Sequence, residues 1–103
     1  MSTVGMLIQQ TTEATGASTE AVRGVLSQGA RHIPEGTKVN RESLAEAFEA
    51  TRADLNGEPG GSDRTEKLDI LSYLETELNS LGRLKQIVVF GAIGSNIGEL
   101  REG

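Results

Sequence analysis

A regular series of leucines is the strongest structural signal in this sequence. The intervals are three, four and three residues, which place the side chains on one face of an α-helix. Asp63 and Glu66 have the spacing of a capping box, so this helix is predicted to begin near residue 63 and to extend to about residue 84. Two heptads are short of an extended coiled coil, so the face is expected to pack on a core or on a partner. The series comprises Leu71, Leu74, Leu78 and Leu81.

Three shorter helices are predicted before the leucine series, over residues 3–15, 19–29 and 41–55. Each has apolar residues at helical spacing. Ser18 and Asn40 are good N-caps for the second and third of these helices. Gly16 and Gly29 are natural helix stops. The intervening residues 31–39 contain proline and glycine and are expected to form a loop.

The segment that follows the leucine helix fits two interpretations. Ile87 to Phe90 is β-branched and aromatic, which favours a buried strand. Leu81, Leu84 and Val88 also continue a helical stripe, so a helical extension remains open. A strand here would need a partner from another copy or another protein, because no second strand is predicted and a lone strand leaves its backbone unpaired. The glycines at 91, 94 and 98 favour an irregular tail.

The predicted fold is therefore mainly α: one small four-helix domain over residues 1–103 with an apolar C-terminal arm. It divides into N-terminal helices (1–62), the leucine helix (63–84) and the arm (85–103). The chain has only three aromatic residues, Phe48, Tyr73 and Phe90, so leucine, isoleucine and valine must supply most of the core. Thirteen glycines raise the entropic cost of folding. Association with a partner is a plausible source of further buried area.

The charge is unevenly distributed along the chain. The net charge is −5, yet residues 1–40 are neutral, so residues 41–103 carry the whole excess. This balance excludes a uniformly basic nucleic-acid binder but allows a local basic face. The longest apolar run, residues 87–93, is too short to cross a bilayer, and the first residues lack a secretory signal. The expected location is the cytoplasm, or a virion or secretion assembly.

Residues 8–27 have a partial helix-turn-helix pattern. The run from Gly16 to Leu26 is similar to the headpieces of bacterial repressors of the lactose-repressor type. The resemblance spans about 20 residues and implies a recognition helix in the major groove of DNA. It departs from that family at three threonines, Thr11, Thr12 and Thr15, where the repressors have apolar or small residues. The residues that it would place on DNA are Thr19, Glu20 and Arg23.

Groups for catalysis or cofactor binding are sparse. The chain has no cysteine and one histidine, His32. The sequence from Asp54 to Glu58 begins like a calcium loop but lacks the glycine at position 6 and the acid at position 12. The glycines from Gly91 to Gly98 are spaced too widely for a dinucleotide turn, and too little chain follows for the rest of such a unit. We therefore expect no enzyme activity, cofactor or metal.

The resulting functional prediction is a non-enzymatic structural or interaction subunit of a larger assembly. A phage particle, a secretion or injection apparatus and a cytoplasmic scaffold all fit. Its partners would be copies of itself, another protein or both, with DNA binding as the alternative. The predicted interface consists of the leucine series and the apolar arm: Leu71, Leu74, Leu78, Leu81, Ile87, Val88, Val89 and Phe90.

Overall fold

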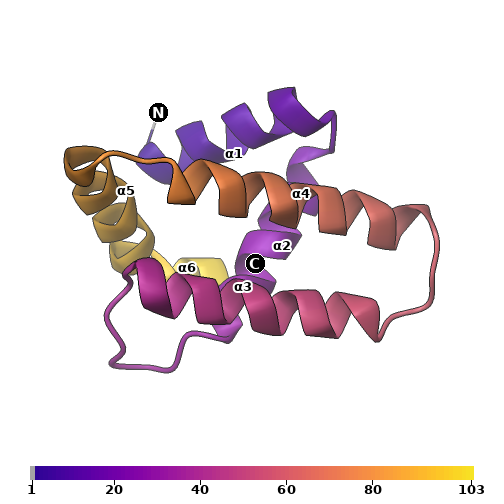
Figure 1. The fold of residues 1–103 in the computed structure, drawn as a ribbon. Coiled ribbons are helices and arrows are strands. Elements are labelled where there is room, and N and C mark those ends of the chain that lie inside the picture. The colour runs from indigo at the N-terminus through magenta and orange to yellow at the C-terminus, as the bar shows by residue number, and fades with distance from the viewer. Residues whose placement is uncertain (1) are drawn as a thin grey trace.

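The computed structural model describes residues 2–103, which fold into six α-helices (Figure 1). The mainly-α prediction is confirmed, and the described residues contain no strand. The four predicted helices are present, and the C-terminal arm adds two more. The helices are α1 (Thr3–Thr15), α2 (Thr19–Arg31), α3 (Arg41–Asn56), α4 (Ser62–Asn79), α5 (Arg83–Ser95) and α6 (Ile97–Glu102).

Helices α3 and α4 form an antiparallel pair, and α1 and α2 pack against α4 (Figure 1). The α4 leucines fill the centre of this arrangement. Leu71 and Leu74 are completely buried, and Leu78 is nearly so. The surrounding core is almost wholly aliphatic, with Phe48 and Phe90 as its aromatic members. The leucine series therefore belongs to the chain's own core.

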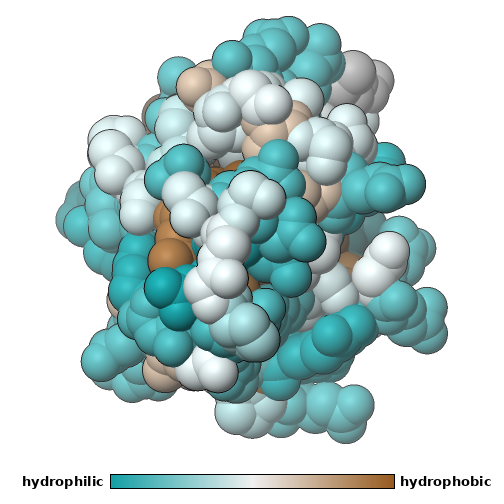
Figure 2. All heavy atoms as spheres, turned by 90° about the vertical axis from the view of Figure 1, so that its right-hand side faces the viewer, coloured by the Kyte–Doolittle hydropathy of each residue, from teal (hydrophilic) through white to brown (hydrophobic). Residues whose placement is uncertain are grey.

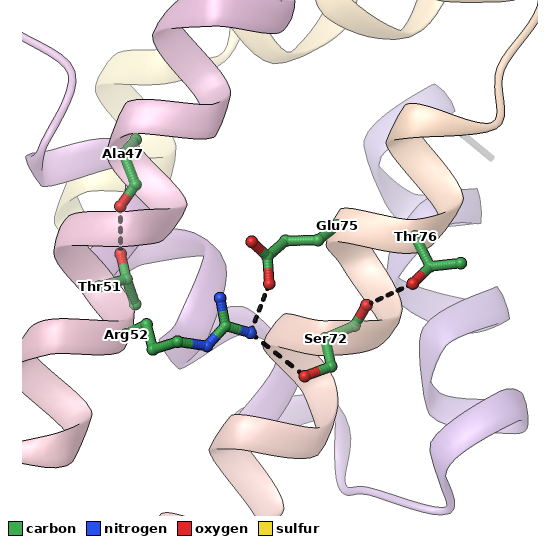
Figure 3. A network of polar contacts seen from close by, with 6 residues as sticks. All are labelled: Ala47, Thr51, Arg52, Ser72, Glu75 and Thr76. Atoms are coloured by element: carbon green, nitrogen blue, oxygen red, sulfur yellow. Dashed lines mark hydrogen bonds and ion pairs between the residues drawn. The ribbon is translucent and has the colours of Figure 1, made fainter.

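Polar contacts also join α3 to α4 at the edge of the core (Figure 3). The Arg52 guanidinium donates to the Glu75 carboxylate and, at 3.2 Å, to the Ser72 hydroxyl. The hydrogen bond with Glu75 raises the pKa of Arg52, against a smaller effect of burial. Both side chains are partly solvent-exposed, so this ion pair stabilises the fold by at most about 1 kcal/mol.

Two buried threonines show how polar residues enter this core. The Thr11 hydroxyl donates to the Leu7 carbonyl at 2.7 Å. The Thr51 hydroxyl donates to the Ala47 carbonyl at 2.8 Å, as Figure 3 shows. Each hydroxyl is satisfied within its own helix, so the methyl group can pack with the neighbouring aliphatic side chains.

Side-chain caps begin three of the helices. The Ser18 hydroxyl accepts from the Ala21 N–H at 3.1 Å, and the Asn40 side chain accepts from the Ser43 N–H at 2.8 Å. Both predicted N-caps are thereby confirmed. Ser2 caps α1 in the same way. Gly16 ends α1 with φ of +73°, a left-handed conformation that favours glycine.

The predicted capping box at the start of α4 is wrong. This helix begins at Ser62, its N-cap is Gly61, and no side chain caps it. Because the helix starts earlier than predicted, Asp63 lies inside the first turn. Its carboxylate there interacts favourably with the positive end of the helix dipole instead of capping the helix.

Helix α4 ends at Asn79, before the predicted boundary near residue 84. The Ser80 N–H bonds back to the carbonyls of Thr76 and Glu77, which closes the last turn. Gly82 then adopts an extended conformation and serves as the N-cap of α5. This interruption turns α5 away from α4, so that it crosses one end of the molecule (Figure 1).

The apolar arm is helical, which settles the choice between strand and helix. An α-helix pairs its own backbone groups, whereas a lone strand would leave them exposed. Phe90 and Ile93 are buried and attach α5 to the core. Gly91 and Gly94 lie inside α5, and Gly98 lies inside α6, so the expectation of an irregular tail is wrong.

Helix α6 is attached to the end of α2 by reciprocal hydrogen bonds. The Arg101 guanidinium donates to the carbonyls of Ile33 at 2.7 Å and Ala30 at 3.3 Å. Arg31 Nε in turn donates to the Arg101 carbonyl at 3.0 Å. A positive side chain at the last carbonyls of a helix satisfies acceptors and complements the helix dipole. These bonds hold the C-terminal helix in place.

The burial pattern predicts a large loss of stability for one leucine substitution and almost none for another. Leu74→Ala opens a cavity in the core and should lower the free energy of unfolding by about 2–5 kcal/mol. Leu84→Ala, on the exposed side of α5, should change it by less than about 0.5 kcal/mol. Urea denaturation followed by circular dichroism measures both values. Equal losses for the two variants would contradict the placement of these helices.

Candidate functional site

Helix α5 presents an uncovered apolar surface. Leu84, Ile87 and Val88 expose 80%, 69% and 59% of their surface. Their positions follow an i, i+3, i+4 pattern, so they lie on one side of the helix. We refer to these three residues as the α5 face. Gly91 continues the same side one turn further, and it is also exposed.

The opposite side of α5 is firmly packed. Phe90 and Ile93 are buried in the core, and Val89 packs partly against it. The Gln86 side-chain amide donates to the Leu81 carbonyl at 3.0 Å, which reinforces the start of the helix. The α5 face is therefore exposed although the helix that carries it is anchored to the core.

An open groove of about 620 Å³ runs beside the α5 face. One wall is α5 together with the first residue of α6, and the other is the loop before α3. Its lining includes the apolar residues Val39, Phe90 and Ile97, and the charged residues that line it are Lys38 and Arg41. We call it the α5 groove. Gly91 and Gly94 line it without side chains, which keeps it open.

The loop wall of the groove is held in place by specific contacts. Ile33 and Val39 are buried and anchor its two ends. Gly36 turns the chain with φ of +79°, where a side chain would be strained. The Ser43 hydroxyl donates to the Lys38 carbonyl at 2.8 Å. Ser43 also forms the capping box of α3 with Asn40. These contacts fix the position of the loop backbone at Lys38.

The cations around the groove have no acidic partner in the structure. Ion pairs among residues 2–103 involve His32, Arg52 and Lys67, which lie elsewhere. Arg41 donates to the Asn79 carbonyl at 3.3 Å, which leaves its charge uncompensated. Arg83 and Lys85 are exposed in the first turn of α5. The charged residues that line the groove, Lys38 and Arg41, are therefore both basic and free of an acidic partner, and two more cations lie on the helix that forms one wall.

The structure divides the predicted interface into two groups. Leu71, Leu74 and Leu78 are buried in the core, so they are not available to a partner in this conformation. Leu81 and Val89 are partly buried, and Phe90 is buried. Ile87 and Val88 are exposed and adjacent. The leucine series fails as a surface because other helices of the same chain already cover it.

Leu84 is the surface residue that the sequence prediction missed. It contributes the most exposed side chain of the α5 face. The spacing of residues 84, 87, 88 and 91 was the available signal, since it marks one side of a helix. That signal is meaningful only when the segment is known to be helical, which the sequence left open.

The end of the molecule that faces away from α5 has a different character. Figure 2 shows the side that carries the α3–α4 connection, and its surface is mostly hydrophilic. The most strongly hydrophobic atoms visible there lie mainly in narrow hollows between polar side chains. The large hydrophobic side chains that are exposed within residues 2–103 lie on α5, apart from Met6 on α1.

The residues predicted for DNA contact lie together in the first part of α2. Thr19, Glu20 and Arg23 are exposed, and three residues connect α2 to α1. The hollow beside them is lined by Arg23 and Glu13 as its charged residues. A negative and a positive side chain at this surface do not make a basic patch. The predicted DNA contact is therefore not supported by charge.

His32 pairs with Asp54 across the α2–α3 interface. The His32 Nε2 and Asp54 Oδ2 atoms are 2.5 Å apart, and the Gln28 amide donates to the same oxygen at 3.4 Å. The hydrogen bond with His32, followed by the one from Gln28, lowers the pKa of Asp54. Asp54 lies within α3, so the sequence from Asp54 to Glu58 does not form a calcium loop.

Within residues 2–103, no group of three or more acidic or histidine side chains is arranged to hold a metal ion. Over the same residues, no helix combines the length and the apolar character required to cross a bilayer.

The pair between His32 and Asp54 predicts a shifted titration. An NMR titration of the Asp54 carboxyl carbon should have its midpoint below the ordinary value of about 3.9. His32→Ala should raise that midpoint, and Gln28→Ala should raise it less. Because folding lowers the pKa of Asp54, its pair with His32 stabilises the fold at pH values above the ordinary pKa of an aspartate. This stabilisation is lost as the pH falls through the pKa of Asp54 in the folded state. An unchanged midpoint in His32→Ala would show that the pair does not form in solution.

Comparisons of the chain with models of protein families, with curated protein sequences and with solved structures find no match.

Proposed function

We propose that this chain is a non-enzymatic interaction subunit that docks in a larger assembly through the α5 face. One observation carries the proposal: three large aliphatic side chains are exposed on one side of a helix whose other side is anchored in the core. An apolar cluster of this kind is typical of a binding surface, whereas single exposed apolar residues are ordinary.

The concentration of exposed apolar residues supports the proposal. Large hydrophobic residues exposed within residues 2–103 are Leu84, Ile87, Val88 and Met6. Met6 lies on α1, which packs against α5. The other faces therefore offer a partner little apolar area. Covering the α5 face would gain roughly 25 cal/mol for each Å² of apolar surface removed from water.

The assembly itself is proposed only by class. A phage particle, a secretion or injection apparatus and a cytoplasmic scaffold each contain small subunits that function by contact alone. The buried α4 leucines make the proposed surface smaller than the sequence suggested. It now consists of the α5 face and the adjoining α5 groove.

Site-specific photo-crosslinking tests the proposal. The photoreactive residue p-benzoylphenylalanine replaces Leu84 or Ile87, and in a matched control it replaces Glu46, which is exposed on α3. In a cell extract of the source organism, the α5 positions should yield a discrete adduct that the control position does not. Mass spectrometry of the adduct identifies its second chain as another copy or a different protein. Absence of any adduct specific to α5 would contradict the proposal.

DNA binding remains the alternative function. The short connection between α1 and α2 and the shared exposed turn of Thr19, Glu20 and Arg23 favour it. Its weakness is charge, because specific binding normally requires several lysine or arginine contacts with phosphate.

Fluorescence anisotropy with a duplex DNA at low salt separates the two functions. We expect no binding that depends on Arg23. Binding that weakens steeply with salt, and that Arg23→Ala reduces while Lys67→Ala does not, would favour the alternative over docking through α5.

A further inference from the structure

We infer that the α5 groove binds an acidic amphipathic helix of a different protein. This inference rests on the proposed function and specifies the chemistry of the partner. It depends on three observations: the charge around the groove, the apolar lining of the groove, and the absence of a matching surface on the chain itself.

The charged side chains that line the groove are both basic. Residues 36–41 and 82–98, which contain the whole lining, carry four basic residues and no acidic residue, and the exposed Glu35 and Glu42 border the first of these segments. The rest of the chain sums to −9. The cations are Lys38, Arg41, Arg83 and Lys85. An acidic protein that gathers unpaired cations beside its exposed apolar face is electrostatically complementary to an acidic ligand.

The lining of the groove specifies more than charge. Val39 and Phe90 form its nearly buried floor, Ile87 and Ile97 offer apolar surface that a ligand can reach, and Lys38 and Arg41 are its charged members. A ligand that complements this arrangement needs apolar side chains for the centre and carboxylates for the margin. A polyanion such as nucleic acid supplies negative charge, but it leaves the apolar surfaces of the groove and the α5 face uncovered.

A helix is the form of ligand that fits the spacing of the surface. Helix α5 has 13 residues and is therefore about 20 Å long. A partner helix of comparable length presents apolar anchors at i, i+3 or i+4, and i+7, the usual pattern of helix-in-groove recognition. The surface at Gly91, where an added β-carbon would meet nothing within 4 Å, is open to one such anchor.

A second copy of this chain does not have the required surface. Its exposed large apolar residues are those of α5 together with Met6. The α5 helix of a second copy carries Arg83 and Lys85 and no acidic residue, so it supplies no carboxylate for Lys38 and Arg41. If α5 of one copy contacted the acidic surfaces of the other copy, carboxylates would be buried and few apolar side chains would meet α5. The charge and the apolar surface together therefore favour a different protein.

A designed peptide tests the inference directly. The probe is a fluorescein-labelled helix of about 18 residues, or five turns, with leucines at three anchor positions and glutamates on the flanks. Its controls carry lysine in place of glutamate, or serine in place of leucine. We expect the glutamate–leucine peptide to bind. Its contacts in ¹⁵N-resolved NMR spectra of the full chain should map to residues 37–41 and 84–97.

Charge reversal supplies the decisive variant. Lys38→Glu with Arg41→Glu should weaken binding of the acidic peptide at least about tenfold and create binding of the lysine peptide. The matched control, Arg23→Glu with Lys67→Glu, changes the net charge equally but lies outside the groove, so it should affect binding much less. Circular dichroism verifies that both variants fold.

Several results would overturn the inference. Equal binding of the glutamate and lysine peptides, or no binding of either, rejects an acidic partner helix. Binding of phosphatidylserine vesicles or duplex DNA that the groove variant abolishes, without peptide binding, assigns the surface to a membrane or to nucleic acid. A crosslink from Ile87 to a second copy of this chain would also reject it. If α5 crosslinks to another protein but the acidic peptide fails to bind, the proposed function stands and only the partner chemistry is wrong.

Discussion

The packing of the α4 leucines is the interaction on which the rest of the structure depends. Leu71, Leu74 and Leu78 contribute to the contacts that bring α1, α2 and α3 around one helix. With few aromatic residues available, this aliphatic packing must supply most of the buried area. A leucine series that looked equally suitable for an interface is thus required for the fold, because a small domain has no other comparable source of hydrophobic stabilisation.

The same packing explains why α5 has a free side. The four preceding helices already enclose the core, so α5 contributes Phe90 and Ile93 at one end of it. A helix with apolar residues on both sides cannot bury both at the edge of a small domain. Leu84, Ile87 and Val88 therefore remain outside. The α5 face is exposed because α5 lies at the edge of the domain. Its exposure is the observation on which the docking proposal rests.

Much of the fold could be predicted from local patterns. Helix α1 has its predicted bounds, and Ser18 and Asn40 cap the helices that they were expected to cap. Predictions failed where the local sequence suits two structures about equally well, as with neighbouring helix starts or with strand and helix. Asp63 lies one position inside a helix whose start is set by Gly61, and the apolar arm has β-branched residues in a helix. Part of the candidate site, Ile87 and Val88, was found. Leu84 and the loop wall were not, because their proximity depends on the orientation of α5.

By itself, the sequence determined the helical class, the starts of the first three helices and the uneven charge. These properties depend on residue spacing, caps and composition, all of which act over a few neighbouring residues. Only the tertiary structure decided which apolar residues are buried. That choice depends on long-range packing: α4 is surrounded by other helices, whereas α5 is covered on one side. The juxtaposition of Lys38 and Arg41 with the apolar α5 groove likewise exists only after folding, since residues far apart in the chain form its two walls.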